Sequence, residues 1–346
     1  MKAMLYENFN TAPKIASVPD PTPTADGIVV RVEATGICRS DWHGWVGHAD
    51  DIALPHVPGH EFAGVVEATG KNVTRFKRGD RVTAPFIAAC GTCHECNSGN
   101  QQTCLHQTQA GFSSWGSFAE YVAVECADTN MVHLPESIDF VTAASLGCRF
   151  ATSFRAVVDQ GKVRGGEWLV VHGAGGIGLA AIMIAKAFGS NVIAVDIVES
   201  KLDFARQIGA DYTVNSRTSS DHIQEILEIT KGGAHVSIDA LGNPKTSYNS
   251  IKNLRPRGRH VQVGLIIENA GDSYVPMYQV MAKELEVYGS HGMQAWRYDD
   301  MLRMITNGSL KPEKLIGKTV SLENGIQHLT SMADTPDTGI VVIDRF

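Results

Sequence analysis

Four of the seven cysteines lie in one short loop and have the spacing of metal ligands. Their order is Cys90-x2-Cys93-x2-Cys96-x7-Cys104, in a segment rich in Gly, Asn and Gln. Four thiolates can surround one Zn²⁺ tetrahedrally, and such a closed site stabilises the fold because no position is left for water or substrate. Disulfides and an iron–sulfur cluster are the alternatives, but a ferredoxin run has an x3 gap followed by proline, where this chain has x7 and Leu105. We therefore expect a structural zinc site.

A second set of possible ligands, Cys38, His60 and Cys148, is dispersed along the chain. Each alone has an ordinary interpretation, because a single Cys is most often a small buried hydrophobe and most histidines bind no metal. Together, two sulfurs and one imidazole would hold a zinc ion with an open fourth position for water or a substrate oxygen, as in catalytic sites. Asp41 is the candidate to accept the second ring N–H of His60 and so fix its tautomer.

A glycine-rich segment, Gly173-Ala-Gly175-Gly176-Ile-Gly178, lies between an apolar stretch that predicts a strand and one that predicts a helix. In this context the glycines allow a tight turn and a close approach of backbone N–H groups to a pyrophosphate. Asp196 ends the next predicted strand, eighteen residues after Gly178, where a carboxylate would bind the adenosine ribose and repel the 2′-phosphate of NADP. The pattern predicts NAD as the coenzyme, and a glycine turn without any ligand is the alternative.

The elements that must position these residues follow from the hydrophobic periodicity. From residue 167 onward, apolar strands alternate with helical patterns that begin at 177 and lie near 199–208 and 220–230. The strands are expected at 168–171, 191–195, 211–214, 236–240, 260–264 and 285–290. This alternation predicts an α/β fold with a doubly wound, six-stranded parallel sheet. The apolar run 168–185 could just span a membrane, but its glycines divide it into strand, turn and helix.

Residues 1–150 predict a β-rich domain with little helix. Strands are expected at 29–34, 61–68, 81–84 and 118–124. After the parallel sheet the pattern changes again, to a helix at 298–305 that Gly308 ends and a strand at 339–344. We expect residues 1–150 and 293–346 to form one domain, with a zinc lobe at about 88–106, and residues 151–292 to form the dinucleotide-binding domain.

The overall composition excludes some partners. The 346 residues carry a formal net charge of −7 with acidic and basic side chains interspersed, so no basic face is expected for nucleic acid or a membrane surface. Residues 1–14 contain no apolar stretch long enough for a signal peptide, which predicts a cytoplasmic protein.

With these motifs, the sequence resembles the zinc-containing medium-chain alcohol dehydrogenase family over nearly its whole length. The segment Gly59-His-Glu-Phe-Ala-Gly-Val-Val66 is similar to the family's signature, the four-cysteine loop to its structural zinc lobe, and the glycine turn to its coenzyme turn. The resemblance implies a GroES-like catalytic domain beside a Rossmann domain, two zinc ions per chain, and NAD(H). It also implies that Cys38, His60 and Cys148 bind the catalytic zinc, with Glu61 as an occasional ligand.

The resemblance assigns further roles by position in each motif. Ser40 and His43 match the family's proton relay. Arg39 would face the pyrophosphate, Lys201 the adenosine ribose, and Thr152 and Ile177 the nicotinamide. Val263 and Leu265 would add further coenzyme contacts. Apolar residues at or near the positions of the family's substrate pocket, each of which could equally be ordinary core, are Trp45, Phe86, Phe112, Trp115 and Leu265.

These assignments define a reaction. Zinc lowers the pKa of a bound alcohol, Ser40 passes the hydroxyl proton through the coenzyme ribose to His43, and hydride transfer to NAD gives an aldehyde or ketone. We expect primary or secondary alcohols with apolar or aromatic substituents. One departure is Arg149, directly after Cys148, where a small residue would be less intrusive and a guanidinium could alter the preference for charged substrates.

Two other functions stay open at this point. A polyol dehydrogenase of the same superfamily would usually bind zinc with fewer thiolates, so Cys148 argues against it. A non-catalytic zinc protein that retains the fold would be expected to lose a ligand or relay residue, and none is lost. By analogy with the fold we expect a homodimer or homotetramer, with 285–290 as the edge strand that aligns.

Overall fold

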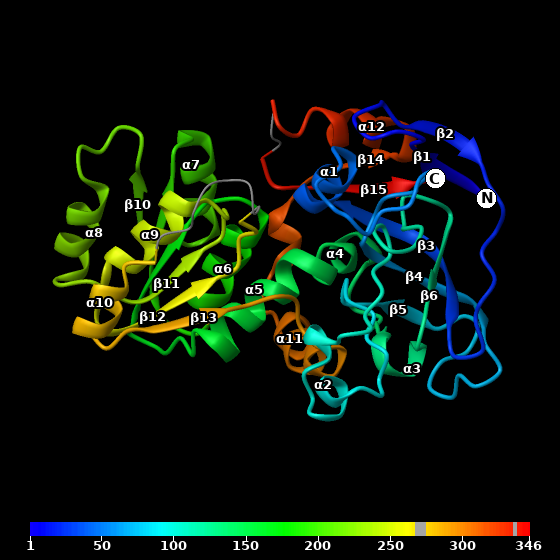
Figure 1. Cartoon of the computed structure of the whole chain (residues 1–346), viewed down its shortest axis with the longest axis horizontal. Coiled ribbons are helices and arrows are strands. Elements are labelled where there is room, and N and C mark those ends of the chain that lie inside the picture. The colour runs from blue at the N-terminus through cyan, green and yellow to red at the C-terminus, as the bar shows by residue number, and fades with distance from the viewer. Residues whose placement is uncertain (267–274, 335–337) are drawn as a thin grey trace. The chain divides into compact units, whose positions relative to one another are not determined.

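The computed structural model describes residues 1–266, 275–334 and 338–346 (Figure 1). The chain divides into two compact units. Met1–Ala151, Gly292–Gly308 and Pro312–Phe346 form the first, and Thr152–His291 with Ser309–Lys311 form the second. The predicted α/β class, with a β-rich domain and a doubly wound parallel sheet, is confirmed. No helix in the described ranges is long and apolar enough to cross a membrane.

The first unit is built on a mostly antiparallel sheet, which has seven strands within the described residues. Its order is β14-β15-β3-β4-β5-β7, and β6 pairs with β3. The bounds are β3 Ile28–Ile37, β4 Glu61–Thr69, β5 Arg81–Thr83, β6 Tyr121–Val124, β7 Val132–His133, β14 Ile316–Ser321 and β15 Ile340–Arg345. A separate hairpin joins β1 (Lys2–Leu5) and β2 (Lys14–Ser17). Alternating side chains of β3 and β4, such as Val30, Val32 and Phe62, fill a buried core.

The strand expected at 118–124 begins later, at Tyr121. The backbone N–H groups of Ser117 and Phe118 donate instead to the carbonyls of Gly59 and Pro58, at 2.9 Å each. The residues before β6 therefore brace the segment that carries His60.

Short helices connect the strands of the first unit. Their bounds are α1 Arg39–Trp45, α2 His94–Asn97, α3 Ala127–Asn130, α4 Phe140–Ala144, α11 Tyr298–Thr306 and α12 Leu322–Thr330. The predicted helix at 298–305 is confirmed as α11, which buries Tyr298, Met301 and Leu302 at helical spacing. Helix α4 packs on β3 and β4 and leads into a π-helical turn, Leu146–Phe150, followed by α5 (Ala151–Arg155). Such turns occur frequently at functional sites.

The second unit holds a fully parallel sheet of six strands, counted over the described part of the chain. The strands in spatial order are β10 Tyr212–Asn215, β9 Asn191–Asp196, β8 Trp168–His172, β11 Ala234–Asp239, β12 Leu254–Gln262 and β13 Glu286–Gly289. The helices are α6 Gly176–Ala187, α7 Glu199–Ile208, α8 His222–Thr230, α9 Pro244–Lys252 and α10 Met277–Ala282. This order is that of a doubly wound dinucleotide-binding sheet. All strands stay parallel, but the chain adds strands toward one edge from β8 to β10 and toward the other edge from β11 to β13.

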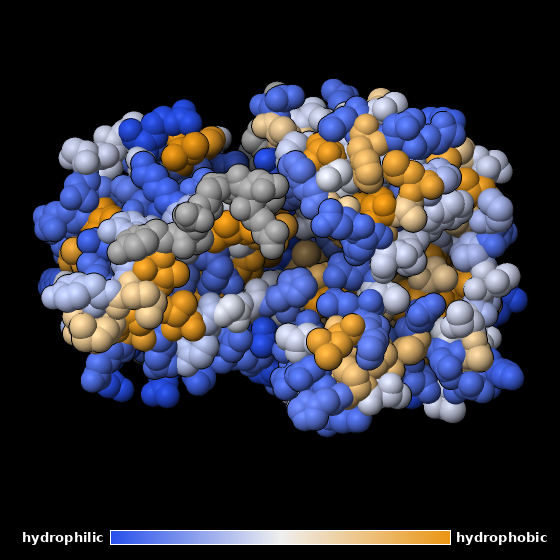
Figure 2. Space-filling model, viewed as in Figure 1, coloured by the Kyte–Doolittle hydropathy of each residue, from blue (hydrophilic) through white to orange (hydrophobic). Residues whose placement is uncertain are grey.

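Apolar side chains are exposed at one edge of the second unit. Strand β13 is the last strand of the sheet, and α10 has no buried residue. Figure 2 shows hydrophobic side chains gathered over α10. The most exposed apolar residues of these two elements are Met277, Tyr278, Met281 and Val287.

Candidate metal centre and coenzyme turn

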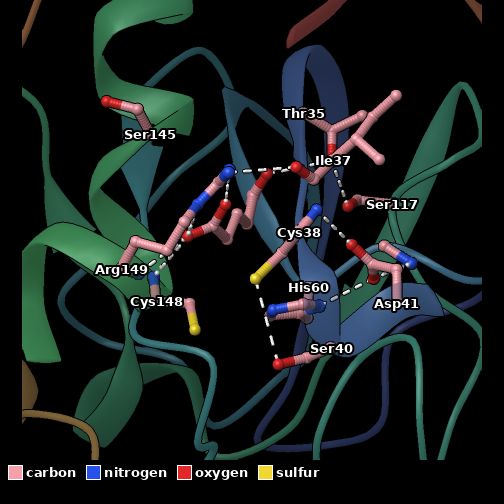
Figure 3. A network of polar contacts seen from close by, with 12 residues as sticks. Thr35, Ile37, Cys38, Ser40, Asp41, His60, Ser117, Ser145, Cys148 and Arg149 are labelled. Carbon is pink, nitrogen blue, oxygen red and sulfur yellow. Dashed lines mark hydrogen bonds and ion pairs between the residues drawn. The ribbon is translucent and has the colours of Figure 1, made fainter. Parts of the chain in front are cut away.

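The three dispersed ligand candidates meet in the first unit. Cys38 directly follows β3, and His60 directly precedes β4, whose register pairs Gly36 with Glu61. Cys148 lies on the π-helical turn after α4. Their ligand atoms all lie within 4.8 Å of one another, and all three residues are buried (Figure 3).

Asp41, on the first turn of α1, orients the imidazole of His60 and the backbone beside Cys38 and His60. Its Oδ1 accepts from His60 Nδ1 at 2.7 Å and from the Gly59 N–H at 3.1 Å, and its Oδ2 accepts from the Cys38 N–H at 2.8 Å. Because a carboxylate oxygen accepts, a neutral His60 in this contact carries its proton on Nδ1 and has the lone pair on Nε2. Nε2 is buried and has no hydrogen-bond partner among the described residues. Two thiols and an unpartnered imidazole nitrogen form a donor set that fits zinc.

The surroundings prepare the ligands electrostatically. The hydrogen bond between the two thiols lowers the pKa of Cys38 well below its ordinary value and raises that of Cys148, while Arg149 and His60 further lower the pKa of Cys38. Burial opposes protonation of His60, yet the Asp41 carboxylate raises its pKa well above the ordinary value. One thiolate thus forms readily, and the remaining protons would be displaced by a metal ion.

Arg149 points into the protein interior, where its guanidinium forms an ion pair with Glu61. Burial alone would lower the pKa of Arg149, but the charges of Glu61 and Cys38 raise it. The sequence analysis singled out Arg149 but indicated neither the orientation of its side chain nor its partner Glu61. No local sequence pattern could do so, because Arg149 and Glu61 lie far apart along the chain.

The two relay candidates lie on α1. Ser40 Oγ is 3.9 Å from Cys38 Sγ, and His43 Nδ1 is 3.0 Å from Nδ1 of His48. Burial, with the nearby charges of Arg39 and His48, lowers the pKa of His43 to about 4. His43 is therefore neutral at neutral pH. His48 was not predicted from the sequence, although its position one turn beyond α1 could have indicated it.

The four-cysteine loop brings its sulfurs together around α2. The Sγ atoms are 3.4 Å apart between Cys93 and Cys96, 3.8 Å between Cys93 and Cys104, and 3.9 Å between Cys90 and Cys96. Four sulfurs at the usual distance from one zinc ion would lie about 3.8 Å apart. Backbone N–H groups, chiefly that of Thr92, lower the pKa of Cys90 to about 5. The geometry fits a closed tetrahedral site.

The glycine turn connects β8 to α6 in the second unit. A Cβ on Gly178 would lie 1.8 Å from the Gly173 carbonyl oxygen, so only glycine fits there, whereas the space beside Gly175 is open. Asp196 ends β9, and its Oδ2 accepts the Ala174 N–H of the turn at 2.8 Å. Val263 directly follows β12. These residues share the carboxyl edge of the sheet, where doubly wound folds bind dinucleotides.

The remaining coenzyme candidates are placed as follows. Ile177 lies in the first turn of α6, and its carbonyl accepts from Ser153 Oγ at 2.8 Å. Thr152 is buried, and its Oγ1 has no hydrogen-bond partner within the described residues. Lys201 lies on α7. Arg39 belongs to the first unit, where its guanidinium is exposed and donates to the Met332 carbonyl at 3.2 Å.

The five pocket candidates have different surroundings within their own units. Phe86 and Phe112 lie beside His60, with ring centroids 6.2 and 5.4 Å from the imidazole, and Phe86 lines a cavity of about 210 Å³ together with His60. Trp45 instead packs in the hydrophobic core and donates to the Thr11 carbonyl at 2.8 Å. The indole of Trp115 donates to Pro55 at 3.1 Å, and Leu265, in the second unit, is 66% exposed.

Comparisons with known proteins agree with both units. Residues 24–136 match the model of the alcohol dehydrogenase GroES-like domain, and residues 176–307 match that of the zinc-binding dehydrogenase family. An alcohol dehydrogenase of Geobacillus stearothermophilus is 34% identical over 294 residues, which cover 84% of each chain. An acryloyl-coenzyme A reductase of Sulfurisphaera tokodaii is 31% identical over 99% of each chain. The solved structure of an NAD-dependent alcohol dehydrogenase, 31% identical, covers both chains fully with a TM-score of 0.89. By these similarities the chain belongs to the zinc-containing medium-chain alcohol dehydrogenase family.

Proposed function

We propose that this protein is a zinc-dependent alcohol dehydrogenase that transfers hydride from a primary or secondary alcohol to NAD, giving an aldehyde or ketone. Membership of the family supports an oxidoreductase that uses zinc and a nicotinamide coenzyme. The observation that carries the proposal is the convergence of Cys38 Sγ, Cys148 Sγ and the unpartnered His60 Nε2. Three ligands of this kind leave one coordination position for a substrate oxygen.

Cys38, His60 and Cys148 would hold the catalytic metal, and Asp41 keeps His60 in the tautomer that presents Nε2. Zinc bound there would act as a Lewis acid that lowers the pKa of an alcohol hydroxyl and polarises a carbonyl in the reverse direction. Phe86 and Phe112 border His60 and give the site an apolar wall, which favours alcohols with apolar or aromatic substituents.

Ser40 and His43 would move the proton. The Ser40 hydroxyl, whose Oγ is 3.9 Å from Cys38 Sγ, would accept a proton from a substrate hydroxyl at the metal centre. His43 is neutral above about pH 4, so it can take up a proton and release it to solvent, with His48 in contact. The same two side chains would supply the proton when a carbonyl is reduced.

NAD is the proposed coenzyme because of Asp196 at the carboxyl end of β9. Its carboxylate accepts the Ala174 N–H of the glycine turn, and in doubly wound folds an acidic residue at this position would bind the adenosine ribose. A ribose with free hydroxyls can donate to this carboxylate, whereas a 2′-phosphate is repelled by it. Thr152, Ile177, Val263, Leu265, Lys201 and Arg39 are proposed as further coenzyme contacts.

We also propose two zinc ions per chain, the second one held by the four-cysteine loop, and a homodimer or homotetramer. The exposed edge strand β13 and the apolar side chains of α10 support self-association through this edge.

The proposed function is tested by a panel of alcohols assayed for reduction of NAD and of NADP, with the metal content measured in parallel for the parent and for Cys38→Ser. We expect the variant to lose one of two zinc ions and nearly all activity. A variant with both zinc ions and full activity would refute the assignment of the catalytic site. Sugar alcohols belong in the panel, and activity on them alone would favour a polyol dehydrogenase.

The similarity to an acryloyl-coenzyme A reductase favours a second candidate, reduction of an activated carbon–carbon double bond. Such a reaction consumes reduced coenzyme and does not require oxidation of an alcohol. Incubation with acryloyl-coenzyme A and either reduced coenzyme separates the two candidates, because only the reductase would consume the thioester. A metal-loaded protein that reacts with neither class would indicate a non-catalytic zinc protein.

A further inference from the structure

Glu61 follows His60 and is completely buried, so its carboxylate must find all its partners inside the protein. Its Oε1 accepts from the backbone N–H groups of Cys148 at 3.2 Å and Arg149 at 2.8 Å. The same oxygen accepts from Arg149 Nε at 3.2 Å, and its Oε2 pairs with Arg149 Nη2. Both carboxylate oxygens are therefore occupied by donors from the π-helical turn that carries Cys148.

The guanidinium of Arg149 also reaches the segment that carries Cys38. Its Nη1 donates to the carbonyl of Ile37, the residue before Cys38, at 3.0 Å, as Figure 3 shows. The Arg149 side chain thus contacts Ile37, which precedes Cys38, and Glu61, which follows His60. Arg149 itself follows Cys148. In the described structure, one buried side chain connects the three segments of the site.

Strand β3 passes close to the Arg149–Glu61 ion pair at Gly36, which has no side chain. A Cβ built on Gly36 would lie 2.8 Å from both Arg149 Nη2 and Glu61 Oε2. Both atoms would have to move to admit even a methyl group. The close approach of β3 to the ion pair therefore requires glycine at position 36.

Arg149 neutralises Glu61, and two thiolates would neutralise a divalent metal ion. The Asp41 carboxylate is stabilised separately, by the three N–H groups that donate to it. Without the guanidinium, Glu61 would be a buried carboxylate beside the metal site with no compensating charge. Such a group turns toward the nearest cation or takes up a proton. Its pairing with Arg149 argues against Glu61 as an occasional metal ligand, the role that the family resemblance implied.

We propose that Arg149 is a positioning residue, which holds the Glu61 carboxylate away from the metal and fixes the Ile37–Cys38, His60–Glu61 and Cys148–Arg149 segments in a geometry competent for metal binding. This inference rests on the proposed metal site and adds a residue that acts on the metal through another residue. The pair acts in the absence of substrate and coenzyme, so its effects can be measured on the metal alone.

The test replaces the metal at the three-residue site with Co²⁺ and measures two quantities without alcohol or coenzyme. These are the ligand-field absorption of Co²⁺, which reports its ligands and their geometry, and the rate of metal release to an excess of EDTA. In Arg149→Met we expect a changed absorption spectrum and a metal release about 10- to 100-fold faster, in line with the usual loss of affinity on removing a residue that supports a ligand. The four-cysteine site should keep its metal, which reports that the first unit is folded.

A double variant separates this role from general packing. In Arg149→Met combined with Glu61→Gln, the amide oxygen still accepts the N–H groups of the turn and no charge is left unpaired. We expect the release rate and the spectrum of this variant to return close to those of the parent. Gly36→Ala, which displaces the pair without removing either charge, should change the spectrum in the same direction as Arg149→Met. The matched control is Arg259→Met, which breaks the partly buried ion pair with Glu167 in the second unit and should change neither quantity.

Two results would overturn the proposal. One is an Arg149→Met protein with the spectrum and release rate of the parent. The other is a double variant no better than the single one, which would mean that Arg149 acts on the thiolates directly. If Arg149→Met does not fold, Arg149→Lys carries the same comparisons, because lysine keeps the charge but cannot reach Ile37 and both Glu61 oxygens at once. A parent protein that binds metal normally but oxidises no alcohol would refute the proposed function and leave this test valid.

Discussion

Replacement of Asp41 by alanine should weaken metal binding and the fold together, because three buried donors depend on this one carboxylate. The N–H groups of Cys38 and Gly59 would lose a charged acceptor, at about 1.5–3 kcal/mol each. The free energy of unfolding should therefore fall by about 3–6 kcal/mol. The third donor, His60 Nδ1, would no longer be oriented, which lowers metal affinity about 10- to 100-fold, or about 1.4–2.7 kcal/mol.

The oxygens of Asp41 allow these two effects to be separated. Oδ1 accepts from His60 and Gly59, while Oδ2 accepts from Cys38 alone among the described residues. In Asp41→Asn the remaining oxygen can keep the His60 contact, but the amide would face the Cys38 N–H as donor against donor. We expect Asp41→Asn to retain most of the metal affinity and to lose stability, whereas Asp41→Ala should lose both.

Zinc affinity is measured by competition with a chromogenic chelator, and the free energy of unfolding by guanidinium titration of the metal-loaded proteins. Asp128→Ala is the matched control, since Asp128 also accepts the backbone N–H groups of Thr74 and Arg75 but is placed outside the metal site. An Asp41→Ala protein that binds zinc as tightly as the parent, or unfolds at the same guanidinium concentration, would refute the reasoning.

Burial lowers the pKa of His260 to about 4. Below about pH 6.5 this histidine is protonated in the unfolded chain but still neutral in the folded protein, so the free energy of unfolding falls as the pH decreases toward about 4. His260→Asn should flatten the dependence of the thermal midpoint on pH in that range. Asp196→Ala should shift the ratio of kcat/KM for NAD over NADP by about tenfold toward NADP, and an unchanged ratio would remove Asp196 from coenzyme selection. Cys104→Ser should release the metal of the four-cysteine loop and lower the thermal midpoint, while Co²⁺ absorption at the three-residue site persists. Val287→Glu on the exposed edge strand should shift the mass measured by light scattering toward the monomer, and an unaltered mass would exclude this edge.

The parallel sheet could be predicted where buried strands are short apolar runs. Strands β8 and β9 are of this kind, and their predicted bounds differ from the observed ones by one residue at the C-terminal end. Strand β12 was predicted six residues too late at its start, at 260 and not at Leu254. Its first half, Arg255–Gly258, holds arginine, proline and glycine and is largely exposed, so it carries no apolar signal. Sequence patterns thus locate the buried part of a strand better than its exposed part.

The two metal-site candidates differ in what the sequence alone could indicate. The four cysteines are close in the chain, so their spacing already limits the geometry. Cys38, His60 and Cys148 were assigned through family resemblance, because their proximity depends on the β3–β4 register and on a π-helical turn that no local pattern predicts. The Arg149–Glu61 pair joins residues 88 positions apart, and only the folded chain reveals it.

The register between β3 and β4 also has a consequence for the order in which the protein matures. The four-cysteine loop closes over a short stretch, so a nascent chain could capture its metal as soon as that stretch is free in solution. Cys38 and His60 become neighbours only when Gly36 pairs with Glu61, and Cys148 joins them only after α4 packs on these strands. A metal ion bound by these three residues would therefore need the β3–β4 pairing and the packing of α4 to be in place, and its uptake would report completion of the first unit.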